Sequence, residues 1–159
     1  HIMLIKFRGK KIQDACSAKI KELYEKYPKN KVVINDYAAS LMLEFKNHIP
    51  VVWEQEENVM KIKKLLSEDP ESYYVLAMYG KSLFNQISGY CQYLMHGNRP
   101  GEGKIKKQVV DHYEELNGLF EKHPEHDLLK RSLDMATAIM KSYSMEKNRF
   151  DSDWEKTLR

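Results

Sequence analysis

Residues 97–104 carry the residue types that bind phosphate in nucleotide-binding loops, with the sequence Gly-Asn-Arg-Pro-Gly-Glu-Gly-Lys. A phosphate loop of this kind follows a strand, has four residues between its glycines, and has Ser or Thr after its lysine to bind magnesium. Here five residues separate Gly97 from Gly103, Ile105 follows Lys104, and the preceding residues have a helical pattern. The segment is therefore interpreted as a loop between two helices, interrupted by Gly and Pro.

A simpler form of anion binding is an open interpretation for the helix that follows this loop. Backbone N–H groups at a helix N-terminus attract anions. The basic residues that would add charge there are Arg99, Lys104, Lys106 and Lys107. The first 31 residues are also basic, with nine Lys and Arg against three Asp and Glu. Together these features support an alternative function as a small helical nucleic-acid-associated subunit.

Histidines and cysteines do not form a complete set of metal ligands in the sequence. A structural zinc site needs four converging ligands, and His112, His123 and His126 lie near the fifth and sixth predicted helices, with only His123 and His126 close in sequence. They are interpreted as solvated histidines, and no metal or cofactor is expected. Cys16 and Cys91 are far apart among apolar helix positions, so both are expected to be buried, unreactive thiols. Two separate cysteines favour a reducing, cytoplasmic setting.

Carboxylates occur as runs on polar helix faces. The runs are Glu54, Glu56 and Glu57, and then Glu114 and Glu115. A catalytic pair needs two carboxyl groups with differently shifted pKa values in one cleft, so these residues are expected to be solvated. The sequence has no G-x-S-x-G motif of the kind that carries a nucleophilic serine. No catalytic residue is assigned, and the protein is expected not to be an enzyme.

The elements that carry these residues are expected to be helices. The chain has 159 residues, of which 42% are hydrophobic and 31% charged, as in a folded globular domain. No apolar run approaches the roughly 20 residues that cross a bilayer. Apolar residues recur at steps of three and four, which is typical of helices. Six helices are predicted, over residues 12–27, 31–47, 51–68, 71–96, 104–122 and 125–147.

The predicted helices form one domain over residues 12–147, between an N-terminal tail (1–11) and a C-terminal tail (148–159) with a turn at Trp154. In the first tail, His1 and Ile2 precede Met3 and are interpreted as a cloning remnant, and residues 4–7 are a short candidate for extended structure. Asp69 is predicted as the N-cap of the helix over 71–96. Two apolar stripes on that helix indicate that it packs on two sides.

Three prolines, Pro28, Pro70 and Pro124, anchor an internal repeat. Similar residues stand six, nine, ten and thirteen positions after the first two: Ile34, Tyr37, Ala38 and Leu41, and then Leu76, Tyr79, Gly80 and Leu83. This pattern resembles the tetratricopeptide repeat family over residues 16–140. The prolines are 42 and 54 residues apart, whereas that family repeats after about 34.

The resemblance implies an all-α fold of antiparallel helix hairpins, stacked as a short right-handed α-solenoid. Another array of helix hairpins and a compact bundle are the alternatives. In the family, small residues such as Ala38 and Gly80 let the paired helix come close, and the first helix of each pair lines a concave face. That face is expected to carry Asn35, Asp36, Tyr74, Met78, Lys81, Asn85 and Arg131. The resemblance therefore implies a protein-interaction module, a scaffold or adaptor that binds a peptide or a partner-protein surface, with no membrane partner.

Overall fold

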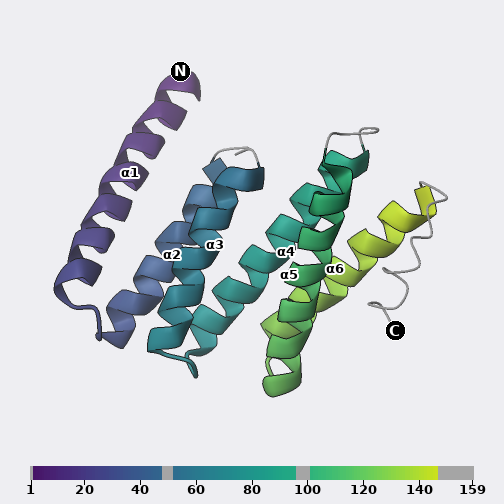
Figure 1. Ribbon diagram of the computed structural model, residues 1–159. Coiled ribbons are helices and arrows are strands. Elements are labelled where there is room, and N and C mark those ends of the chain that lie inside the picture. The colour runs from purple at the N-terminus through teal and green to yellow at the C-terminus, as the bar shows by residue number, and fades with distance from the viewer. Residues whose placement is uncertain (1, 48–51, 96–100, 147–159) are drawn as a thin grey trace.

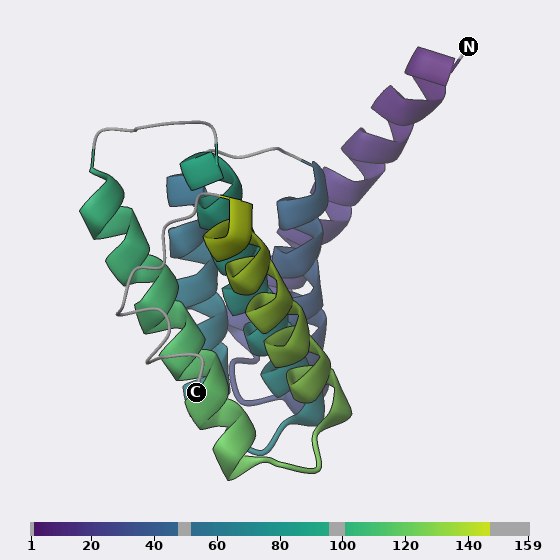
Figure 2. The ribbon, with the colours of Figure 1, turned by 90° about the vertical axis from the view of Figure 1, so that its right-hand side faces the viewer.

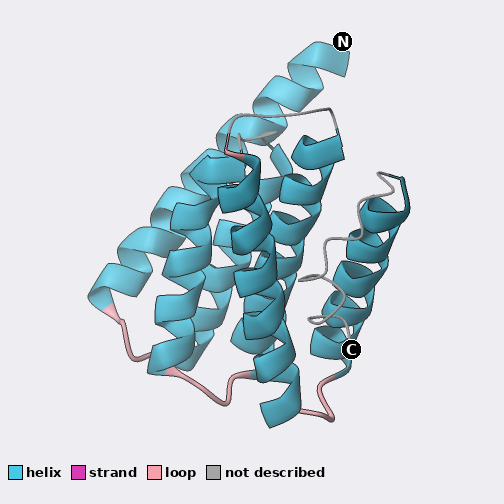
Figure 3. Ribbon diagram, turned by 45° about the vertical axis from the view of Figure 1, so that its right-hand side comes forward, coloured by secondary structure: helices cyan, strands magenta, loops and turns pink. Residues whose placement is uncertain are grey.

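The computed structural model describes residues 2–47, 52–95 and 101–146, and its regular structure is helical (Figures 1 and 3). The helices are α1 (Ile2–Lys26), α2 (Lys31–Asn47), α3 (Val52–Glu68), α4 (Tyr73–Met95), α5 (Glu102–Lys122) and α6 (Asp127–Glu146). The predicted all-α class with six helices is confirmed, and the described residues contain no strand. Within them, no helix has both the length and the apolar character that crossing a membrane requires. The predicted C-terminal tail with its turn at Trp154 lies outside the described residues.

Helix α1 begins well before the predicted start. The sequence predicts a helix from residue 12 and extended structure at residues 4–7, but α1 starts at Ile2 and includes both. A single glycine, Gly9, is tolerated because it costs a helix only about 1 kcal/mol relative to alanine. The backbone of α1 packs against α2, and its N-terminal part extends away from the other helices (Figures 1 and 2).

Each repeat proline lies in a tight turn that leads into a helix. The turns span residues 27–30, 69–72 and 123–126, with proline in the second position, where its fixed φ angle fits. In each turn the N–H of the fourth residue donates to the carbonyl oxygen of the first. The bonds join Asn30 to Tyr27 (3.1 Å), Ser72 to Asp69 (3.1 Å) and His126 to His123 (3.0 Å). The repeat in the sequence is therefore also a repeat of hydrogen-bonded structure.

The fourth residue of each turn is the N-cap of the helix that follows. Its side chain accepts the N–H three residues on: Asn30 Oδ1 from Val33 (3.2 Å), Ser72 Oγ from Val75 (3.2 Å) and His126 Nδ1 from Leu129 (3.3 Å). The prediction of Asp69 as the cap of α4 is therefore wrong. Asp69 is the first residue of the turn, and its buried carboxylate lies 3.4 Å from Lys31 Nζ instead.

Helix α4 is central, because it contacts α2, α3, α5 and α6. The prediction that this helix packs on more than one side is confirmed. The equivalent positions of the first two repeats are all buried: Ile34, Tyr37, Ala38, Leu41, Leu76, Tyr79, Gly80 and Leu83. The third helix of this kind, α6, buries a different set: Leu129, Ser132, Ala136, Met140 and Tyr143.

Gly80 is the small residue that the repeat pattern places next to the paired helix, α5. A Cβ atom built on Gly80 would instead come closest to Leu129 in α6, and Leu116 in α5 would lie farther away. The absence of a side chain at Gly80 therefore allows α4 and α6 to lie close together at this point.

Candidate functional site

Helices α4 and α6 form the walls of a groove with a volume of about 270 Å³. It is lined by Ala77, Met78, Lys81, Leu128, Arg131, Ser132 and Met135. The two helices contact each other, and their N-terminal ends are joined, because His126, the residue before α6, bonds to the carbonyl of Tyr73 at the start of α4. We call this feature the α4/α6 groove.

The α4/α6 groove combines apolar side chains with two cations. Leu128 is 38% exposed and Met135 is 37% exposed, although large apolar side chains are usually covered. Lys81 and Arg131 are exposed on opposite walls. Neither cation has a hydrogen-bond or ion-pair partner among the described residues. Flexible methionines adapt to varied apolar surfaces, and an unpaired arginine can bind a carboxylate through two hydrogen bonds.

The groove contains only some of the residues predicted for the concave face. Met78, Lys81 and Arg131 line it together. Tyr74 and Asn85 lie on α4 one turn before Met78 and one turn after Lys81, outside the lining. Tyr74 is 59% exposed, and Asn85 is half-buried.

The two predicted contact residues of α2 lie away from the groove. Asn35 is half-buried, and its Oδ1 accepts a hydrogen bond from Ser72 Oγ at 2.9 Å. This bond joins α2 to the cap of α4, so the Asn35 side chain supports the fold. Asp36 is exposed on α2.

Leu128 was not among the residues predicted from the sequence, yet the repeat carries a signal for it. It stands four positions after Pro124, as Val32 and Tyr74 stand four positions after their own prolines. All three are large apolar residues that face solvent, with exposed fractions of 68% for Val32, 59% for Tyr74 and 38% for Leu128. Comparing the repeats at this position would have identified it.

The basic residues predicted as anion contacts do not form a free cluster. Lys106 Nζ lies 3.3 Å from Glu102, and Lys107 Nζ lies 2.7 Å from Asp111, in both cases one helical turn away. Lys104 is exposed. Arg99 lies outside the described residues.

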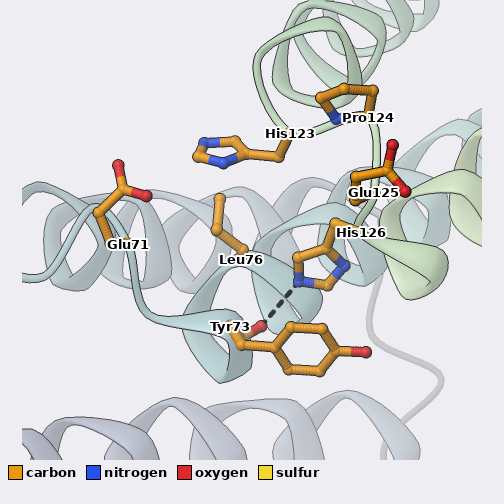
Figure 4. Close-up of a pocket in the computed structure, with 7 residues that line it drawn as sticks. All are labelled: Glu71, Tyr73, Leu76, His123, Pro124, Glu125 and His126. Carbon is orange, nitrogen blue, oxygen red and sulfur yellow. Dashed lines mark hydrogen bonds between the residues drawn. The ribbon is translucent and has the colours of Figure 1, made fainter.

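A second cavity, of about 340 Å³, lies between two of the proline turns (Figure 4). It is lined by Glu71, Tyr73, Leu76, His123, Pro124, Glu125 and His126. The His123 side chain points across Leu76 toward Glu71, while the His126 ring lies beside the ring of Tyr73 (Figure 4). We call this cavity the turn pocket.

The prediction of solvated histidines is wrong for two of the three. His126 is buried, its Nε2 lies 2.9 Å from the Tyr73 carbonyl oxygen, and its ring stacks on that of Tyr73 at 4.1 Å. His112 is half-buried, and its Nε2 lies 2.8 Å from Glu56 Oε1. Both rings are packed against other helices, where a polar atom needs a partner. The described residues contain no group of three or more His, Cys, Asp or Glu that could hold a metal ion.

Two carboxylates that were expected to be solvated accept hydrogen bonds from buried tyrosines. Glu56 in α3 accepts from Tyr90 at 2.7 Å, and Glu115 in α5 accepts from Tyr79 at 2.7 Å. Burial raises the pKa of Glu56, but the hydrogen bonds from His112 and Tyr90 outweigh it and hold that pKa below its ordinary value. Burial and the bond to Glu115 raise the pKa of the Tyr79 hydroxyl. These contacts link α3 and α5 to the central helix.

The two cysteines have different surroundings. Cys91 is fully buried as predicted, and burial raises its thiol pKa to about 12. Cys16 is exposed, so its predicted burial is wrong. Cys16 lies on α1, whose backbone packs against that of α2 alone among the described helices. A position on α1 that faces away from α2 is therefore exposed to water, even where the sequence pattern around it is apolar.

Among the described residues, the α4/α6 groove and the turn pocket thus differ in chemistry. The α4/α6 groove presents cations without partners, whereas the buried polar atoms of His126 at the turn pocket already hold the fold together. Comparison with protein families, with curated proteins and with solved structures finds no match for this chain.

Proposed function

We propose that this protein is a protein-interaction module, a tetratricopeptide-like scaffold or adaptor that binds an acidic segment of a partner protein in the α4/α6 groove. The observation that carries the proposal is that Lys81 and Arg131, two cations without partners among the described residues, line the same groove as several apolar side chains. Carboxylates of the partner would pair with these cations. An apolar partner side chain would pack on Met78, Leu128 and Met135.

We further propose that the helices are antiparallel hairpins stacked as a right-handed α-solenoid. Support comes from the order of helix contacts: α2 contacts α4, α4 contacts α6, and each also contacts its neighbours in the chain. The three equivalent proline turns add to this, because each begins one of these three helices. A stack of repeats forms an extended surface of the kind that binds peptides.

Binding without catalysis is part of the same proposal. Four groups of the kind that carry catalysis in other proteins support this proposal, because Glu56, Glu115 and His126 bond to neighbouring helices and Cys91 is buried. A cytoplasmic location is also proposed, because both cysteines are unpaired and Cys16 is exposed, which suits a reducing compartment.

A titration with two synthetic peptides tests the proposed groove. One alternates glutamate with leucine, and the other alternates lysine with leucine. The methyl signals of the methionines report binding by nuclear magnetic resonance. We expect the glutamate peptide to shift the signals of Met78 and Met135, which line the groove, and to leave that of the fully buried Met140 in place. Binding of the lysine peptide alone would contradict the proposal.

Charge reversal tests whether Lys81 and Arg131 bind the carboxylates of the glutamate peptide. Lys81→Glu and Arg131→Glu should each weaken binding of the glutamate peptide by about tenfold, because like charges face each other. Lys64→Glu makes the same change in net charge at an exposed position of α3 and should leave the affinity close to that of the unmodified protein. An equal loss in all three variants would show only a general charge effect. Tight, strongly salt-dependent binding of a nucleic-acid duplex would favour the alternative function instead.

A further inference from the structure

The chemistry of the α4/α6 groove has a counterpart in the chain itself. Residues 147–159 lie outside the described residues, and among them residues 150–155 have the sequence Phe-Asp-Ser-Asp-Trp-Glu, with three carboxylates, two aromatic rings and no cation. The groove has complementary groups, since Lys81 and Arg131 have no partner among the described residues and lie beside apolar side chains. We propose that the groove binds residues 150–155 of its own chain, which we call the acidic tail segment, and that acidic segments with aromatic residues are its class of ligand.

One face of α6 leads from the groove to the end of the helix. Leu128, Arg131 and Met135 in the groove are followed, at steps of three and four, by Ala138 and Ser142, so all five lie on one face. All five are exposed. The last residue of α6 follows Ser142 by four positions, so the chain leaves the helix on the face that carries the groove. The small side chains at 138 and 142 leave room for a segment that runs back along this face.

An extended chain reaches the groove from the end of α6. Arg131 lies fifteen positions before Glu146, which is about 22 Å along the helix axis. Asp153 lies seven positions after Glu146, and an extended chain covers about 24 Å over that length. Met135 lies eleven positions before Glu146 and Asp151 five positions after it, which correspond to about 16 Å and about 17 Å. A helix would rise only about 10 Å over seven positions, so the segment reaches Arg131 when it is extended.

The groups of the acidic tail segment match those of the groove. The guanidinium of Arg131 can bind a carboxylate through two hydrogen bonds. Methionine sulfur packs favourably against aromatic rings, so the two methionines of the groove suit Phe150 and Trp154. A short linker also holds a tethered segment at an effective concentration on the order of millimolar, and here only residues 147–149 separate the segment from α6. Docking is therefore favourable even when a free segment of this sequence binds weakly.

A docked segment competes with any partner that uses the same groove. If the segment occupies the groove about four-fifths of the time, an external peptide binds about fivefold more weakly than to the open groove. This competition rests on the proposed function, because it needs a partner in the groove. The docking of the segment needs no partner.

A nitroxide label on the full-length protein tests where the segment lies. Cys16→Ser removes the exposed thiol, Ser152→Cys places one within the acidic tail segment, and the remaining cysteine is fully buried. A label at residue 152 should broaden the methyl signals of Met78 and Met135 in the nuclear magnetic resonance spectrum. The signal of Met60 should stay sharp, because it is exposed on α3, whose backbone does not pack against α6.

Neutralising the segment tests the competition. The variant with Asp151→Asn, Asp153→Asn and Glu155→Gln should bind the peptide that alternates glutamate with leucine about fivefold more tightly than the unmodified protein. A matched control neutralises three exposed carboxylates of α1 and α5, at Asp14, Glu114 and Glu121. It should change the affinity by less than about twofold, because salt screens distant charges.

Three results would overturn the inference. One is equal broadening of all three methionine signals, or of none. Another is broadening that occurs only between chains, when spin-labelled protein is mixed with isotope-labelled protein that carries no nitroxide, since a second copy would then be the occupant. The third is an equal affinity for the peptide in the unmodified protein and the neutralised variant. The label experiment contains no partner, so its failure leaves the proposed function standing, whereas a peptide that binds neither protein contradicts the proposed function and not the docking.

Discussion

The Cδ2 atom of Leu129 occupies the space that a side chain on residue 80 would need. An ideal Cβ atom built on Gly80 would overlap Leu129 Cδ2 and would lie 3.4 Å from Leu116 Cδ1. Leu129 is 0% exposed, so it has no open solvent to move into. Gly80 therefore sets the separation of α4 and α6, although neither it nor Leu129 lines the groove between them.

We expect Gly80→Ala to lower the free energy of unfolding by about 1 to 2 kcal/mol. Overpacking of a buried site costs about 1–3 kcal/mol, and this exceeds the gain of up to about 1 kcal/mol in helix propensity. The matched variant is Gly118→Ala in α5, where a new Cβ atom would meet nothing within 4 Å. It should raise the free energy of unfolding by up to about 1 kcal/mol. Urea unfolding measures both, and stabilisation by both variants would contradict the close contact at Gly80.

Glu56→Gln tests the contact between α3 and the buried tyrosine of α4. The pKa of Glu56 is held below its ordinary value of 4.5 in the folded state. Its carboxylate therefore stabilises the fold fully above about pH 4.5, and this contribution is lost as the pH falls below that value. We expect the variant to lose about 1–3 kcal/mol near pH 7 and less near about pH 3, as measured by urea unfolding.

The control for this measurement is Glu57→Gln. Glu57 is exposed and pairs with Lys61 in the same helix, so its loss should change stability less than the loss of Glu56. A penalty for Glu56→Gln that grows toward low pH would show that the carboxylate is not the stabilising form.

The two thiols should react at very different rates. With its pKa raised to about 12, Cys91 has about one thiolate in ten thousand near pH 8, and it is also fully buried. Cys16 is exposed. Maleimide labelling followed by intact-mass measurement should show one rapid modification, which Cys16→Ser removes. Rapid labelling of the Cys16→Ser variant in the absence of denaturant would contradict the burial of Cys91.

Removal of the N-cap of α4, Ser72, should destabilise the protein more than removal of the N-cap of α2, Asn30. Ser72 Oγ accepts from Val75 N–H and also donates to Asn35 in α2, whereas Asn30 caps only its own helix, through Val32 and Val33. We expect Ser72→Ala to cost about 2 kcal/mol and Asn30→Ala about 1 kcal/mol. Thermal unfolding of the two variants measures the difference. A larger loss for Asn30→Ala would mean that the bond between Ser72 and Asn35 contributes nothing.

Local features of this protein could be predicted from the sequence with few errors. The apolar periodicity identified all six helices, with the end of α2 at residue 47 and the end of α3 at residue 68 as observed. The three prolines marked the turns that lead into α2, α4 and α6. Errors arose where two local signals competed, as at the start of α4, where Ser72 caps the helix in place of Asp69.

The candidate site depended on contacts between distant parts of the chain. Met78 and Lys81 share a helical face, which spacing alone indicates, but their position opposite Arg131 depends on how α6 packs against α4. The tetratricopeptide resemblance suggested all three, and it also suggested Asn35, which the structure places in a hydrogen bond with Ser72. Spacing reports which residues share a face, and it does not report which faces meet.

The sequence by itself determined the helices, the proline turns and the apolar faces, because each depends on residues within a few positions of one another. Only the tertiary structure decided that Cys16 is exposed, that His126 is buried against Tyr73, and that Glu56 accepts a hydrogen bond from Tyr90. The reason is physical: burial and hydrogen bonding of a side chain depend on neighbours that lie dozens of residues away in the chain, and periodicity carries no information about them.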